Sequence, residues 1–60
     1  MFLELHLYEN NKKFIVNLNK VNTVYMENEI TAIYIGDVVY RIKESYSEIV
    51  DAIGSYYSYI

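Results

Sequence analysis

Apolar and polar side chains alternate at the amino-terminal end, and this pattern limits the fold more than any other feature of the chain. Leu3, Leu5 and Leu7 fall on one side of an extended segment. A period of two is typical of a β-strand with one buried face. Residues 13–18 repeat the pattern, and residues 9–12 between them are polar. Asn in that stretch tolerates left-handed backbone angles, so the two segments are expected to form a β-hairpin.

A third strand is expected after a short interruption. Residues 17–20 break the alternation, because Asn side chains bond to nearby backbone and favour turns or bulges. Residues 21–26 then read as a strand, with Val24 and Met26 facing inward. The polar residues 27–29 form the next turn.

Two more strands follow in the second half. Residues 30–35 are apolar at almost every position except Thr31. Such a run is typical of a central strand covered on both faces, or of a strand with one face held by a partner chain. Gly36 begins a tight turn, since glycine adopts positive φ without steric cost. Residues 38–43 then alternate again as a fifth strand.

The period changes after residue 43 and indicates a carboxy-terminal helix. Ser45 and Glu48 have the spacing of a capping box, in which each side chain bonds to the backbone of the other residue. Apolar residues follow at helical spacing: Ile49, Val50, Ile53 and Tyr57. Gly54 costs about 1 kcal/mol relative to Ala inside a helix. The helix is therefore expected to end there or to continue through Tyr56 and Tyr57 to the terminus.

Together these segments predict one α+β domain over residues 1–60 that is mainly β. Its expected core is a five-stranded antiparallel meander, curved or barrel-like, followed by one C-terminal helix. A domain of this size buries only roughly 60% of its unfolded surface and usually needs additional stabilisation. The chain has no Cys, and His6 is its only nitrogen ligand for a metal. Oligomerisation remains as the source of additional stabilisation, so a homo-oligomer is expected.

Composition argues against several functions. The chain carries 5 basic and 8 acidic residues, a net charge of −3, without a basic patch for nucleic acid or an anionic membrane. It has no run of about 18 apolar residues and no signal-peptide pattern, so a cytoplasmic location without membrane contact is expected. His6 beside Glu4 reads as a surface histidine. No phosphate loop, nucleophile elbow or zinc motif is present, which predicts no enzyme activity and no cofactor.

The eight tyrosines are the most informative feature for function. Tyrosine is favoured at protein interfaces because it offers a large rigid apolar area with one polar tip. The predicted interface comprises Tyr34, Tyr56, Tyr57, Tyr59 and Ile60. A stacking platform for single-stranded nucleic acid would need Lys and Arg among the aromatics, and only Arg41 and Lys43 lie near such a face.

The sequence also resembles the FlbD family of small flagellar and swarming-motility proteins. Residues 40–45, followed by residues 48–50, resemble the family's apolar strand, its Val-Lys-Glu-Ser step and the start of its short helix. Residues 14–17 look like its second segment, and the similarity spans roughly residues 3–53. The family commonly has a Pro-Asp-Thr step, whereas this chain has no Pro. The resemblance implies a small accessory protein that acts by contact and supplies no catalytic residues.

The sequence therefore favours a small non-enzymatic protein-interaction module that is homo-oligomeric. A phage or mobile-element protein that binds and modulates a host protein would fit this description. Two alternatives stay open, namely a FlbD-like motility accessory protein and a small-barrel nucleic-acid-binding protein.

Overall fold

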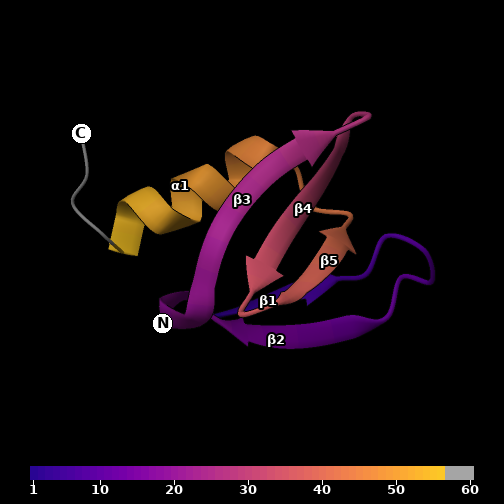
Figure 1. The fold of residues 1–60 in the computed structure, drawn as a ribbon. Helices are drawn as coiled ribbons and strands as arrows, with labels where there is room; N and C mark the ends of the chain where they lie inside the picture. Colours follow the sequence, from indigo (N-terminus) through magenta and orange to yellow (C-terminus); the bar gives the residue numbers. More distant parts are fainter. Residues whose placement is uncertain (57–60) are drawn as a thin grey trace.

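The computed structural model describes residues 1–56, with the backbone alone for Tyr56 (Figure 1). The elements in chain order are β1 (Phe2–His6), β2 (Lys13–Asn17), the 3₁₀ helix η1 (Leu18–Lys20), β3 (Val21–Glu27), β4 (Ile30–Ile35), β5 (Val38–Ile42) and α1 (Tyr46–Tyr56). The predicted order of five strands and a C-terminal helix is confirmed, and so is the mainly β class.

The strands form two antiparallel sheets, one of β1 and β2 and one in the order β3-β4-β5. Just beyond β1 the chain touches the second sheet. The Tyr8 N–H donates to the Arg41 carbonyl at 2.8 Å, and the Lys43 N–H donates to the His6 carbonyl at 2.9 Å. The end of β5 is thereby held against the segment that follows β1.

The expected closure into a curved barrel is not found. Within residues 1–56, β2 and β3 are both edge strands, and no ladder joins them. The physical reason lies in η1, which separates the two strands. The Asn17 side-chain oxygen accepts a hydrogen bond from the Asn19 N–H at 3.0 Å and starts this turn, as the Asn-rich sequence predicts.

The core lies between the inner faces of the two sheets and α1. It consists of five buried aliphatic residues from five different elements: Leu5, Val16, Ile33, Ile42 and Ile49. The alternation therefore predicted the buried faces of β1, β2 and β5 correctly. In β4, Ala32 and Ile33 are both buried, and β4 lies between β3 and β5, as expected of a central strand.

Met26 departs from its predicted place. It was expected to face the core with Val24, yet it is 52% exposed, whereas Val24 packs against the core. Met26 is one residue from the end of β3, an edge strand that has no neighbouring strand on its outer side within residues 1–56. The alternation gives the side of the sheet on which a residue lies, but not whether anything covers that side.

Turn and cap geometry follow the sequence closely. Asn28 and Glu29 have φ of 52° and 65°, as a two-residue type I′ hairpin requires, and Gly36 has φ of 62°. The Glu48 N–H donates to the Ser45 hydroxyl at 3.1 Å, and the Ser45 N–H donates to the Glu48 carboxylate at 3.0 Å, which completes the capping box. The helix continues through Gly54 to Tyr56.

Candidate functional site

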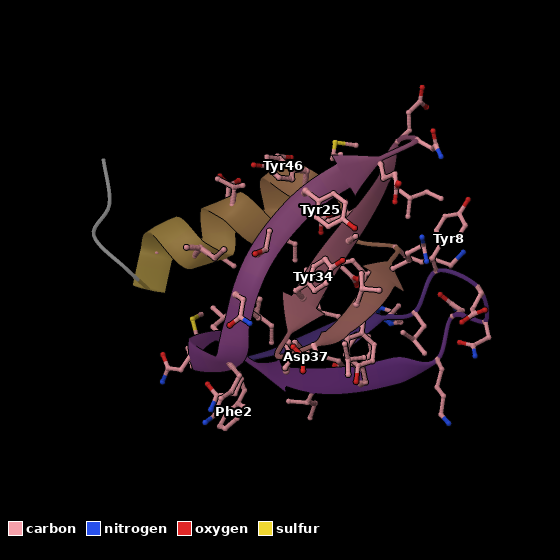
Figure 2. All side chains as sticks on the ribbon, in the orientation of Figure 1. Phe2, Tyr8, Tyr25, Tyr34, Asp37 and Tyr46 are labelled. Carbon is pink, nitrogen blue, oxygen red and sulfur yellow. The ribbon has the colours of Figure 1, made fainter. Side chains whose placement is uncertain are left out.

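A pair of tyrosines occupies the outer face of the three-stranded sheet, the face opposite the core. Tyr25 on β3 is paired with Ala32 on β4, and Thr23 is paired with Tyr34. Tyr25 and Tyr34 are therefore diagonal neighbours on one face. Their ring centroids lie 5.9 Å apart at an interplanar angle of 28°, and Figure 2 shows the two rings side by side.

The residues around this pair complete an apolar surface with a polar border. Ala32 is 1% exposed because its cross-strand neighbours, Tyr25 and Arg41, have long side chains that cover it. The Arg41 guanidinium lies 3.6 Å from the Glu27 carboxylate across this row. Val39 is the cross-strand neighbour of Tyr34 and is exposed. We call Tyr25, Tyr34 and Val39 the tyrosine face.

The Tyr25 hydroxyl on this face is uncharged at neutral pH. The hydrogen bond with the Tyr34 side chain is the main cause that raises the pKa of the Tyr25 hydroxyl above its usual 10.0. Charge on nearby groups is also balanced, because Arg41 is paired with Glu27. A surface of this kind suits contact with protein, where stacked rings are buried and hydroxyls find polar partners.

Of the predicted interface residues, Tyr34 lies on this face. The Tyr56 side chain and residues Tyr57, Tyr59 and Ile60 are outside the described residues, so their assignment stays a prediction. Sequence reasoning did not include Tyr25 or Val39. The missing signal was the register: a hairpin centred on Asn28 and Glu29 places Tyr25 diagonal to Tyr34.

A second polar feature joins β1 to the segment before α1. The Glu44 carboxylate accepts a hydrogen bond from the His6 N–H at 3.0 Å and lies 2.7 Å from the His6 ring nitrogen Nδ1. His6 was expected on the surface beside Glu4, but its partner is Glu44, whose side chain is only 16% exposed. Glu4 instead lies 4.0 Å from Lys13.

The electrostatics of Glu44 identify the role of this pair. Burial alone would raise the pKa of the Glu44 carboxyl, but the hydrogen bonds from the His6 ring and backbone outweigh it and lower the pKa from its usual 4.5. The carboxylate is thus held ionised at the junction of β1 and β5. This pair ties two chain segments together and needs no ligand to explain it.

A groove of about 440 Å³ runs between β3 and α1. Its apolar lining comes from both elements and from η1: Leu18, Val21, Val24, Tyr46, Val50 and Ile53. A second hollow of about 330 Å³ lies beside Tyr8 and Arg41. The Lys43 ammonium sits 5.2 Å from the centre of the Tyr8 ring.

Comparison with known protein families, with curated proteins and with solved structures finds no match. Over the described part of the chain, no three His, Asp or Glu side chains come together as metal ligands would. Neither helix within residues 1–56 is long and apolar enough to span a membrane.

Proposed function

We propose that this chain is a small, self-associating, non-enzymatic interaction module, and that the tyrosine face is the centre of its contact surface. The observation that carries the proposal is the stacked Tyr25–Tyr34 pair with exposed Val39 beside it, on a sheet face opposite the core. Tyrosines dominate the buried centres of protein interfaces because they bury a large area at low entropic cost.

The charges around the tyrosine face favour protein over nucleic acid as a partner. A platform for single-stranded nucleic acid needs cations free to contact phosphates. Here Arg41 is paired with Glu27, and Lys43 lies over the Tyr8 ring. The net charge of −3 adds a repulsive contribution.

The test is the solution mass of the protein by light scattering across a dilution series. The wild-type chain is expected to be an oligomer that dissociates on dilution. The double variant Tyr25→Thr with Tyr34→Thr keeps strand-forming residues on the outer face and is expected to shift the equilibrium to the monomer. Ile15→Thr serves as the matched control, because Ile15 is exposed on the outer face of the other sheet.

Circular dichroism on the same samples separates loss of association from loss of fold. A wild-type chain that is monomeric at millimolar concentration would remove the self-associating part of the proposal. An oligomer that the double variant leaves unchanged would remove the tyrosine face as its contact surface.

A further inference from the structure

We infer that two copies of this chain pair antiparallel along the open edge of β3, with Val24 of each copy at the two-fold axis. The two three-stranded sheets would then form one six-stranded sheet. This inference rests on the proposed self-association and identifies the contact that produces it.

The first observation is that backbone N–H and C=O groups of β3 point away from the sheet. Glu27 and Ile30 flank a two-residue turn, so they form a hydrogen-bonded pair within the hairpin. Hydrogen-bonded pairs alternate along an antiparallel ladder, so Tyr25 also bonds to β4. The N–H and C=O groups of Val24 and Met26 therefore point away from β4, toward an edge that carries no strand within residues 1–56.

The side chains of this edge do little to oppose pairing, although α1 packs beside β3 along the groove. Edge strands that must stay single generally carry Lys or Pro, which oppose the addition of another strand. Among the other strands that end a sheet, β2 begins with Lys13 and β5 contains Arg41, whereas β1, like β3, contains neither Lys, Arg nor Pro. The bulge between Val21 and Thr23 affects only the beginning of β3.

Charge complementarity identifies a second copy as the occupant and fixes the direction. Lys20 precedes β3, whereas Glu27 and Glu29 lie at its far end. Antiparallel pairing centred on Val24 places Lys20 of each copy beside the acidic turn of the other. Parallel pairing would place like charges together, which is destabilising.

The same register satisfies the backbone and side-chain requirements. Val24 of one copy pairs with Val24 of the second, and Met26 of the second copy lies opposite Asn22, the residue at the bulge. The backbone groups of Val24 and Met26 face the open edge. Paired residues share a face, so Met26 of the second copy lies on the core side, next to the groove between β3 and α1. This contact would bury the Met26 side chain, which is 52% exposed in the single chain.

In this dimer the outer faces of the two three-stranded sheets would also become continuous. Thr23 of one copy lies opposite Tyr25 of the second, so the two tyrosine faces adjoin across the axis. The dimer would thereby present one aromatic band built from both chains. Tyr25 of each copy would then contact Thr23 of the other, so the tyrosine face takes part in the self-association proposed for it.

The first experiment compares the solution mass of Met26→Pro with that of the wild-type chain. Proline at this position removes an N–H that points to the open edge and leaves the ladder to β4 intact. Met26→Thr keeps the N–H and is the matched control. We expect Met26→Pro to raise the dissociation constant at least tenfold with an unchanged circular dichroism spectrum, and Met26→Thr to have a smaller effect.

The second experiment maps the axis by oxidation of single cysteine variants, since the chain has no Cys of its own. Two Val24→Cys residues at the axis would have Cα atoms about 5.5 Å apart, within the range of a disulfide. Two Met26→Cys residues would be separated by about 13 Å along the strands and would not cross-link. A covalent dimer is therefore expected from Val24→Cys alone.

The outcomes separate this inference from the proposed function. An oligomer that persists in Met26→Pro, or one in which Met26→Cys cross-links as readily as Val24→Cys, would overturn pairing at the β3 edge and leave self-association standing. A wild-type chain that is monomeric at millimolar concentration would overturn both.

Discussion

Glu29 is the residue whose backbone conformation fits its side chain least well. It has φ of 65° in the second central position of a type I′ turn, where glycine is the preferred residue. A residue with a Cβ atom in this region costs roughly 1–2 kcal/mol, and glycine avoids most of that cost. We expect Glu29→Gly to raise the free energy of unfolding by about 0.5–1 kcal/mol, measured by urea denaturation.

The matched control for this change is Asp37→Gly in the other tight hairpin. Asp37 occupies the second central position there, but it is not among the residues with positive φ. Glycine at position 37 is expected to lower the stability or leave it unchanged. Equal gains at the two positions would contradict the conformational explanation.

Protonation of the Glu44 carboxylate is expected to destabilise this fold in acid. Its pKa is lower in the folded chain than its usual 4.5, so the ionised form stabilises the folded state at pH values above the unfolded pKa. That contribution is lost as the pH falls through the folded pKa. We expect the urea concentration at the denaturation midpoint to decrease as the pH is lowered below about 4.5. Glu44→Gln is expected to be less stable than wild type at pH 7 and to lose less stability in acid.

Glu4→Gln provides the comparison for Glu44→Gln. Glu4 is exposed and lies 4.0 Å from Lys13, a separation at which a surface pair contributes little. An acid decline that is equally steep in Glu44→Gln and in wild type would show that another carboxylate is responsible.

At the scale of the elements, α1 is held to the sheets chiefly by Ile49, which is 3% exposed and belongs to the core. Truncation of a buried Ile to Ala costs about 2–5 kcal/mol, which a domain this small would not tolerate. Ile49→Val removes one methylene and is expected to cost about 0.5–1.5 kcal/mol in chemical denaturation. Ile15→Val, at a site that is 70% exposed, is expected to change stability by less than about 0.5 kcal/mol. Equal effects of the two substitutions would place α1 outside the core.

The elements also show how far the sequence can predict this structure. Period-two alternation and the Ser45–Glu48 capping box depend on neighbouring residues, and both were predicted correctly. The His6–Glu44 pair joins positions 38 residues apart, and no local pattern contains that information. The exposure of Met26 and the failure of β2 and β3 to pair depend on where elements lie in space. In the candidate site, Tyr34 was predicted from composition, whereas Tyr25 required the hairpin register.

At the scale of the whole molecule, the distribution of charge along β3 gives the sharpest prediction about assembly. The Lys20→Glu substitution would place like charges together at both ends of an antiparallel dimer. Two symmetric exposed contacts are then lost, so the dissociation constant is expected to rise roughly tenfold at low ionic strength, and less at high salt. Glu29→Lys is expected to have a similar effect. The double variant, Lys20→Glu with Glu29→Lys, should recover much of the wild-type affinity in sedimentation equilibrium.

Lys12→Glu is the control for this reversal, because it makes the same change in net charge in the turn between β1 and β2. General repulsion between acidic chains would weaken association in Lys12→Glu as much as in Lys20→Glu. Pairing at the β3 edge predicts instead that only Lys20→Glu has a large effect and that only Glu29→Lys rescues it. Rescue by a second charge reversal requires the two side chains to be near each other across the interface, so it reports the antiparallel register as well as the presence of a dimer.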